Sequence, residues 1–235
     1  MQKHLLNFFW QLFKNDYLRF LLVYFRYVFF RTTFAYREID SSYSKPNTNH
    51  HNSAALKDMR TECFYNRIKY LHGILMSLEY IKKNSNILLI GSRTENELFY
   101  LKSYGFKNIT CIDLLSYSPR IKCMDMHNLK FKRKTFDVII CGWVLIYSQN
   151  LKKCVNEIIK VSKNNAIIAI GYAKDKVRQK KNVNTAKQLL NLFGKKVKKN
   201  IFIYDGELSH LSKNNILNLA GHTSSNILTV FKLRK

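Results

Sequence analysis

Acidic residues are scarce in this sequence of 235 residues. Asp and Glu together number 15 against 40 Lys and Arg, which gives a formal net charge of +25. A surplus of this size is typical of proteins that meet an anionic partner, such as RNA, DNA, anionic lipid or an acidic glycan. Most of the basic residues are lysines, whereas specific readers of phosphate and guanine favour arginine. The composition therefore favours contact with an anionic surface over specific recognition of nucleic acid.

Metal-binding patterns are also missing. The chain has no Cys-x-x-Cys pair and no His-Glu-x-x-His, and its five cysteines are scattered: Cys63, Cys111, Cys123, Cys141 and Cys154. Three of them fall in expected strands. We therefore expect reduced cysteines in the core of a cytoplasmic protein, and no metal site.

A long apolar run and a signal-peptide cleavage pattern are absent too. The first 37 residues are rich in aromatic side chains, but Arg19, Arg26 and Arg31 keep each apolar run well short of the ~20 residues that span a bilayer. On a helical projection the polar residues gather on one side and leave an aromatic side. Two interpretations remain open. In the first, the helix lies on the anionic inner face of a membrane. In the second, it packs on the globular domain or on a second subunit of a homodimer.

The remaining sequence has the pattern of one α/β domain. A polar loop over 37–53 separates an N-terminal helical extension, residues 1–50, from a domain over residues 51–235. A helix is expected over 53–85, where Gly73 could interrupt it. From residue 86 apolar strands alternate with amphipathic helices, which predicts a parallel sheet covered on both faces. The expected strands are 86–92, 108–114, 121–126, 136–142, 165–173, 199–208 and 225–234, and the expected helices are 94–105, 150–163 and 182–194.

Two local features of this domain carry separate expectations. Thr94 and Glu97 have the spacing of a capping box at the start of a helix that Gly105 would end. Between the second and third strands, the segment LSYSPR is too short for the usual crossover helix. Either the crossover is reduced to a loop or the third strand is incomplete.

Glycine is scarce where a dinucleotide-binding turn would need it. That turn has the pattern G-x-G-x-x-G, which lets the backbone approach a pyrophosphate at the helix N-terminus. In ILLIGSRTENEL the three positions are Gly91, Arg93 and Asn96. Glu95 and Glu97 also stand in the first helical turn, where carboxylates complement the helix dipole and repel phosphate. NAD is therefore disfavoured.

A nucleoside cofactor without phosphate fits this segment better. S-adenosylmethionine needs a tight turn, an acid for its ribose hydroxyls and polar groups for its adenine. Asp113 ends the second strand, and Asp125 ends the third strand, with Met126 beside it. Because ligands of open parallel sheets bind at the carboxyl ends of the strands, we expect Asp113 to accept from the ribose and Asp125 from the adenine amino group.

At these residues the sequence resembles the class I S-adenosylmethionine-dependent methyltransferases, especially bacterial members that act on small molecules. ILLIGSRTENEL, ITCIDL, MDMHNLKFKRKTFDVIICGWVLIYS and NEIIKVSKNNAIIAIGY stand in the order of that family's glycine-rich motif, acidic motif, adenine loop with fourth strand, and following helix and strand. The resemblance implies a Rossmann-like, doubly wound α/β sheet of order 3-2-1-4-5-7-6 with the last strand antiparallel. It also implies S-adenosylmethionine as cofactor, bound by Gly91, Ser92, Arg93, Asp113, Leu114, Asp125, Met126, Cys141, Gly142 and Trp143.

The sequence also departs from the family pattern. The first motif has one glycine, and Asn164-Asn165 replaces a common Pro-Gly, although Asn tolerates the left-handed turn. Catalytic residues stay unassigned, with His127 and Tyr147 as the candidates near the expected mouth. Three functions remain open: methyl transfer to a small-molecule or membrane-associated acceptor such as a glycan or lipid precursor, methyl transfer to RNA held by the basic segment 174–200, and non-catalytic binding by a protein that keeps the fold.

Overall fold

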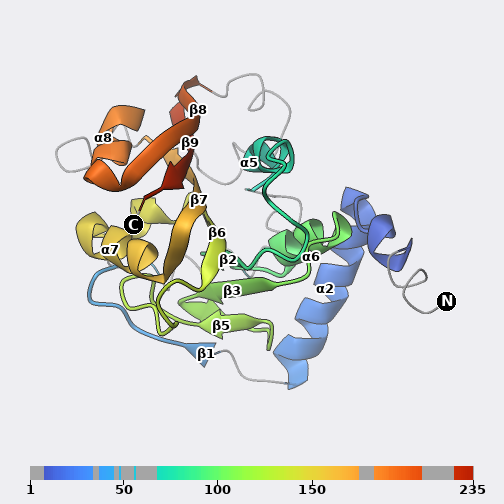
Figure 1. Cartoon of the computed structure of the whole chain (residues 1–235). Coiled ribbons are helices and arrows are strands. Elements are labelled where there is room, and N and C mark those ends of the chain that lie inside the picture. Colours follow the sequence, from blue (N-terminus) through green and yellow to red (C-terminus); the bar gives the residue numbers. More distant parts are fainter. Residues whose placement is uncertain are drawn as a thin grey trace.

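The computed structural model describes residues 8–33, 37–44, 48, 56, 68–174, 183–207 and 225–234. Helices cover both faces of a central sheet in this part of the chain (Figure 1). Within the same ranges, no helix is long and apolar enough to cross a membrane.

Seven strands form the central sheet. They are β2 (Ile87–Ile90), β3 (Ile109–Asp113), β5 (Ile121–Cys123), β6 (Phe136–Gly142), β7 (Ser162–Ala173), β8 (Val197–Glu207) and β9 (Ser225–Leu233). Their spatial order is β5-β3-β2-β6-β7-β9-β8. The first five strands in this order pair in parallel, and β9 is antiparallel to both β7 and β8. Counted along the chain from β2, this is the order 3-2-1-4-5-7-6 with the last strand antiparallel, so the predicted fold class is confirmed.

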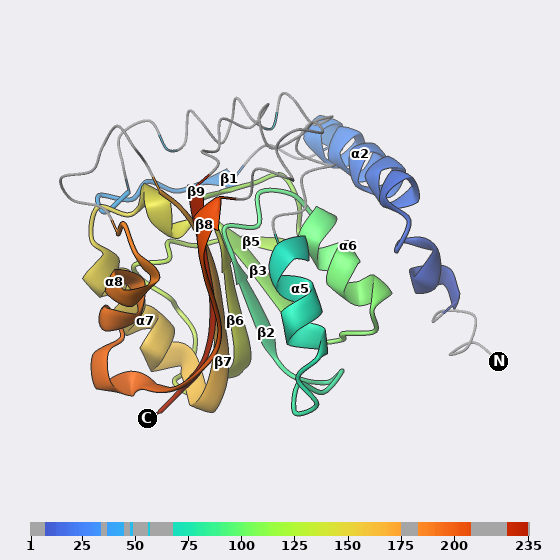
Figure 2. The same cartoon turned by 90° about the horizontal axis from the view of Figure 1, so that it is seen from above.

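The helices bury the sheet from two sides. Figure 2 shows α5 (Lys69–Met76) and α6 (Asn96–Ser103) on one face, and α7 (Leu151–Val161) and α8 (Ala186–Asn191) on the other. Two short 3-10 helices, η1 (Leu145–Tyr147) and η2 (Gly194–Lys196), follow β6 and α8. Because both faces are covered, the central strand β2 is apolar and buried at all four positions rather than alternating.

Two turns are made by single residues with a positive φ angle. Gly105 (φ +87°) follows α6, and Asn165 adopts φ +62° at the position where the related family often has glycine. The predicted capping box on α6 is wrong. Its N-cap is Glu95, which makes no side-chain cap, and the Thr94 hydroxyl accepts from the N–H of Asn96 at 3.3 Å instead. This is a local turn contact two residues away, which competes with the capping geometry.

The helix predicted over 53–85 is shorter in the part that can be assessed. Residues 51–55 and 57–67 lie outside the described ranges. Within the described ranges, α5 runs from Lys69 to Met76 and contains Gly73 in its interior without a break. It therefore ends earlier than the sequence pattern suggested, and residues 77–86 lead into β2 as turns.

The crossover from β3 to β5 is a loop, not a helix. Inside it, the two-residue strand β4 (Leu115–Ser116) pairs antiparallel with β1 (Arg37–Glu38) from the N-terminal segment. β5 is nevertheless a parallel partner of β3. The question raised by LSYSPR is thus resolved, because a strand from elsewhere in the chain satisfies the backbone of this loop.

The N-terminal helix α2 (Asp16–Thr33) packs beside α6 and this crossover loop. Val23 and Tyr27 of α2 form a buried cluster with Phe99 of α6 and with Leu115 and Tyr117 of the loop. The Tyr27 and Tyr117 rings meet edge to face, with centroids 5.1 Å apart. The described part of the N-terminal extension is therefore part of the folded domain.

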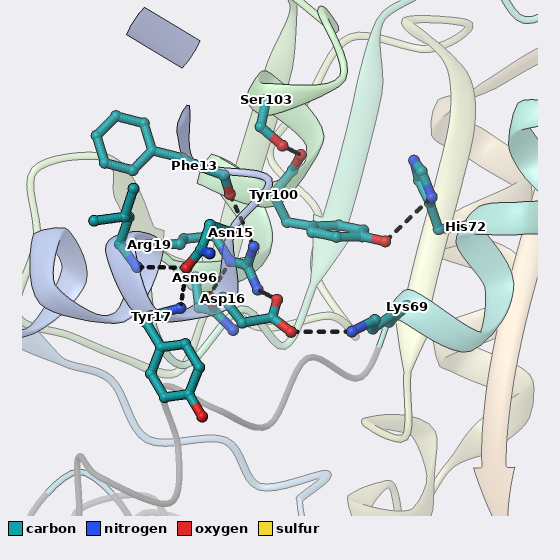
Figure 3. A network of polar contacts seen from close by, with 11 residues as sticks. Phe13, Asn15, Asp16, Tyr17, Arg19, Lys69, His72, Asn96, Tyr100 and Ser103 are labelled. Atoms are coloured by element: carbon teal, nitrogen blue, oxygen red, sulfur yellow. Dashed lines mark hydrogen bonds and ion pairs between the residues drawn. The ribbon is translucent and has the colours of Figure 1, made fainter. Parts of the chain in front are cut away.

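Arginines on the inner side of α2 fasten it to α6. Arg19 is 1% exposed, and its Nε donates to Asn96 Oδ1 at 2.7 Å while Nη1 donates to the Phe13 carbonyl at 2.9 Å (Figure 3). Arg19 also pairs with Asp16, which Lys69 of α5 contacts at 3.1 Å. Further along, Arg26 pairs with the carboxylate of Glu95. The side of α2 that is polar in sequence therefore faces the protein.

Candidate functional site

A pocket opens where the parallel strands β2, β3 and β5 end. The open space within it, counted to the mouth and including the part open to solvent, is about 460 Å³. Its lining comes from the strand ends, from the segment after β6 and from the N-terminal loop: Ser44, Thr48, Ile90, Gly91, Arg93, Ile112, Asp113, Leu114, Met124, Asp125, Met126, Val144 and Tyr147. Six of the ten residues predicted to bind a cofactor are in this set: Gly91, Arg93, Asp113, Leu114, Asp125 and Met126.

Gly91 makes the tight turn after β2. Its φ is +82°, and a Cβ placed on it would lie 2.6 Å from Cβ and Cγ2 of Val144. The N–H groups of Gly91 and Ser92 both donate to the Ile112 carbonyl, at 2.9 and 3.1 Å. The turn therefore requires glycine for its backbone conformation and for the close approach of Val144.

Asp113 and Asp125 both line this pocket. Asp113 is the last residue of β3 and is 8% exposed, and one of its carboxylate oxygens accepts from the N–H of Leu115 at 3.3 Å. Asp125 follows β5 at the same edge of the sheet. The parallel pairing of β3 with β5 brings the two strand ends together, as the sequence argument required.

Asp125 is held by a set of hydrogen bonds. Its Oδ1 accepts from the His127 N–H at 2.9 Å and lies 2.7 Å from His127 Nδ1, and its Oδ2 accepts from the Ser41 hydroxyl at 2.6 Å. Burial by itself would raise the pKa of Asp125, but the hydrogen bonds from His127 and Ser41 outweigh it and lower that pKa below its usual value. The carboxylate is therefore ionised at neutral pH.

His127 lies behind Asp125 and outside the pocket lining. It is 1% exposed. Its Nδ1 faces the Asp125 carboxylate, which can only accept, and its Nε2 lies 2.7 Å from the Ser148 hydroxyl. Both ring nitrogens are thus engaged, so His127 orients Asp125. Tyr147, the other catalytic candidate, does line the pocket.

The N-terminal loop closes one side of the pocket, which the local sequence did not signal. Ser44 and Thr48 contribute to the lining, although residues 37–53 appear in the sequence as a plain polar loop. Gln149 fastens this loop, because its N–H donates to the Tyr43 carbonyl at 2.7 Å and its side chain donates to the Ser44 carbonyl at 3.0 Å. The loop reaches the pocket through hydrogen bonds to Gln149, which is far away in the sequence, so no single segment of the sequence reveals its position.

Comparison with known proteins bears on the fold. The family of proteins described as "Methyltransferase domain" matches residues 88–170. This part of the chain is therefore similar in sequence to a methyltransferase domain. The fold is that of class I S-adenosylmethionine-dependent methyltransferases.

Solved structures share this fold at low sequence identity. The [4+2]-cyclase SpnF is 15% identical with a TM-score of 0.51, over 71% of this chain and 81% of its own. A protein from Galdieria sulphuraria named as a sarcosine dimethylglycine methyltransferase is 11% identical with a TM-score of 0.54, over 74% and 87%. The MccD protein is 13% identical with a TM-score of 0.50, over 71% and 97%. A search of curated proteins gave no match.

Four of the predicted cofactor contacts lie outside the pocket lining: Ser92, Cys141, Gly142 and Trp143. Trp143 adopts φ +58°, which turns its ring into the core against Gly171, and its indole N–H donates to Asn226 at 2.7 Å. The next residue, Val144, takes the place in the lining that the sequence assigned to Trp143. Ser92 and Cys141 are fully buried, and Gly142 pairs with Gly171 in the sheet.

Glu95 and Glu97 do not line the pocket. Glu95 is fully buried, and its carboxylate accepts from Arg26 Nη2 at 2.9 Å and from the Ser118 hydroxyl. Repulsion of phosphate by these two carboxylates, as argued from the sequence, therefore does not arise at the pocket. The acidic groups that face it are Asp113 and Asp125, which would repel phosphate in the same way.

The described residues contain no cluster of side chains that could hold a metal ion, and their cysteines are free. Burial raises the pKa of Cys111 and Cys141 to about 12 in each case. These thiols therefore stay protonated at neutral pH and are unsuited to act as nucleophiles.

Proposed function

We propose that this protein is an S-adenosylmethionine-dependent methyltransferase that acts on a small-molecule or membrane-associated acceptor. The observation that carries the proposal is the convergence of Asp113, Asp125 and the Gly91 turn on one pocket at the carboxyl ends of β2, β3 and β5. The match of residues 88–170 to a methyltransferase domain supports it.

The lining of the pocket suits an uncharged nucleoside. Ribose hydroxyls and an adenine amino group are hydrogen-bond donors, and the ionised carboxylates of Asp113 and Asp125 are acceptors. Apolar side chains such as Ile112 and Met126 supply packing for a ring. Arg93 is the basic residue in the lining and would hold the carboxylate of the amino-acid end.

In this proposal the cofactor supplies an activated methyl group, and the protein supplies position and exclusion of water. Asp113 would fix the ribose, and Asp125 would fix the adenine while His127 and Ser41 keep its carboxylate oriented. Tyr147 and the N-terminal loop residues Ser44 and Thr48 complete the lining of the pocket. Tyr147 is the candidate to meet an acceptor, because its phenol is a polar group at this mouth.

Isothermal titration with S-adenosylmethionine tests the proposal. Wild-type protein is expected to bind, and Asp113→Asn is expected to bind about 10- to 100-fold more weakly, because hydrogen bonds to a charged acceptor contribute about 1.5–3 kcal/mol. Glu79→Gln, an exposed acid before β2, is the matched control and should bind like wild type. Absence of binding by the wild type, or unchanged binding by Asp113→Asn, would remove the proposal.

Two observations favour a second candidate, a protein that keeps the fold without methyl transfer. The N-terminal loop already supplies a hydrogen bond to Asp125, through Ser41, and SpnF, which shares the fold, is described as a [4+2]-cyclase. Cofactor binding without transfer of a labelled methyl group to any cell extract fraction would favour this candidate over the first.

RNA as the acceptor has weaker support. Lys195, Lys196, Lys198 and Lys199 are exposed at the start of β8. β8 runs parallel to β7, since β9 is antiparallel to both, so these lysines lie at the sheet edge opposite the pocket. Residues 175–182 of the basic segment lie outside the described ranges. Salt-sensitive RNA retention in a filter assay, lost in a variant with these four lysines replaced, would revive this acceptor.

A further inference from the structure

The outer side of α2 carries an apolar surface that the domain leaves uncovered. Phe25 and Phe29 are 66% and 59% exposed. Together with four neighbours they form what we call the outer face of α2: Leu18, Leu21, Tyr24, Phe25, Val28 and Phe29. At 100° per residue these positions fall within roughly 140° of the helix circumference. The face is therefore continuous, and it lies opposite the buried residues Arg19, Val23 and Tyr27.

α2 differs from an ordinary surface helix, in which the apolar stripe faces the core and the charged side faces water. Its inner side carries arginines beside the buried Val23 and Tyr27. Arg19 makes a buried contact with Asn96 (Figure 3), and Arg26 makes a partly buried ion pair with Glu95. If α2 were rotated about its axis so that the outer face turned inward, Glu95 would remain a buried charge without Arg26 as its partner. Such an unpaired buried charge costs several kcal/mol. The outer face is thus held toward the outside.

The residues before α2 add further exposed apolar side chains. Phe8, Phe9 and Leu12 are exposed in the short helical stretch over residues 8–12. Single exposed apolar residues are common on soluble proteins, but a contiguous run of this kind marks an interaction site.

The charge around the outer face indicates the occupant. Residues 8–33 contain one acidic residue, Asp16, and it is paired with Arg19 and Lys69. Lys14 before the helix and Arg31 near its end are both exposed. A second copy of a chain with net charge +25 would bring like charges together across such an interface, whereas an anionic surface would attract it.

We propose that the outer face of α2 binds the surface of an anionic lipid bilayer, with α2 lying in the interface. Aromatic and aliphatic side chains would enter the headgroup region, while Lys14 and Arg31 would meet lipid phosphates. In Figure 2, α2 lies beyond α6, near the edge of the sheet at which the parallel strands end. The pocket opens at the same edge. Under the proposed function, on which this consequence rests, the pocket would be presented to an acceptor carried in the membrane.

Vesicle flotation tests the bilayer directly and needs no cofactor. The full chain is expected to float with vesicles of phosphatidylcholine mixed with phosphatidylglycerol, and much less with phosphatidylcholine alone. Phe25→Ser/Phe29→Ser should reduce the bound fraction about tenfold or more, because two phenyl groups no longer leave water. Ile203→Ser, at another exposed apolar residue that lies on β8, is the control and should float like wild type.

Three results would overturn the proposal. Wild-type protein could fail to bind anionic vesicles, or the double variant could bind as wild type does. Alternatively, the wild type could form a concentration-dependent dimer that the double variant loses while neither floats, which would assign the face to a second copy. Because flotation is read without S-adenosylmethionine, and titration of S-adenosylmethionine is read without lipid, failure of one proposal is distinguishable from failure of the other.

Discussion

Gly91 is the residue at which the pocket is most sensitive to one added atom. Its positive φ and its approach to Val144 leave no room for a side chain. Gly91→Ala is therefore expected to destabilise the protein by about 1–3 kcal/mol through backbone strain and overpacking. It should also abolish binding of S-adenosylmethionine, because the turn forms part of the pocket. Urea unfolding and isothermal titration measure the two effects.

Gly73 provides the control for this substitution. It lies inside α5, and a Cβ placed on it meets nothing within 4 Å. Gly73→Ala should instead stabilise the protein by about 0.5–1 kcal/mol, since alanine is the better helix former. If the two variants unfold alike, the argument from Val144 is wrong.

The position and the ionisation of the Asp125 carboxylate depend on a neighbouring residue, His127. His127 was a candidate catalytic group in the sequence, yet both of its ring nitrogens are used in hydrogen bonds. Its contribution is to the position and ionisation of Asp125, and this kind of support is common behind ligand-contacting residues.

At the scale of elements, α2 replaces the missing crossover helix as cover for the loop between β3 and β5. It packs on Leu115 and Tyr117 of that loop and on Phe99 of α6. The ion pair of Arg26 with Glu95 joins α2 to the N-cap of α6, a few residues after the Gly91 turn. Docking of α2 is thereby linked to the segment that forms the pocket.

Arg26→Met is expected to weaken this docking. Removing the guanidinium leaves Glu95 fully buried without its charged partner, which costs about 3–5 kcal/mol in comparable buried pairs. Urea unfolding of the purified variant measures the loss. Arg31→Met, at an exposed position of the same helix, should change stability by less than about 0.5 kcal/mol.

A double variant distinguishes the charge from the packing. Arg26→Met/Glu95→Gln removes the buried charge together with its partner, so most of the lost stability should return. A double variant as unstable as Arg26→Met alone would show that the arginine acts through packing on Phe30 and Phe99, whose rings it covers.

At the scale of the whole molecule, the loss of folding stability in acid depends on His72, a residue of α5 that faces α6. Burial, and then the positive charge of Lys83, lower the pKa of His72 from 6.5 to about 4. Below about pH 6.5 the unfolded chain takes up a proton that the folded protein refuses until about pH 4, so stability falls as the pH falls through this window. The loss is expected to reach about 3 kcal/mol at most.

Urea unfolding at about pH 7 and about pH 4.5 measures this loss, and His72→Asn should remove most of it because the side chain no longer titrates. The carboxyl of Asp125 has a lowered pKa and loses its contribution only at lower pH, so it does not confound the comparison. Equal acid sensitivity in the variant and the wild type would assign the effect to other groups.

Much of the fold and part of the site could be predicted from the sequence. The seven strands of the central sheet and the helices α6 and α7 follow from local periodicity, and the strand order follows from the family resemblance, whereas the short strands β1 and β4 were not predicted. Asp113, Asp125 and Gly91 were placed at one pocket because each ends or follows a parallel strand, a rule that depends on chain direction alone. Trp143 was misplaced at the pocket because its positive φ reverses the direction of its side chain, and a strand pattern does not reveal that.

The sequence by itself determined the layered α/β architecture, the pocket edge and its acidic character, because these depend on residue spacing within short segments. Only the tertiary structure decided that Arg19 of α2 faces inward, that the N-terminal loop reaches Asp125 through Ser41, and that Glu95 is neutralised by Arg26. Each of these is a contact between residues about 70 or more positions apart in the chain. The energy of such a pair depends on geometry that exists only once the chain has folded, so no local pattern encodes it.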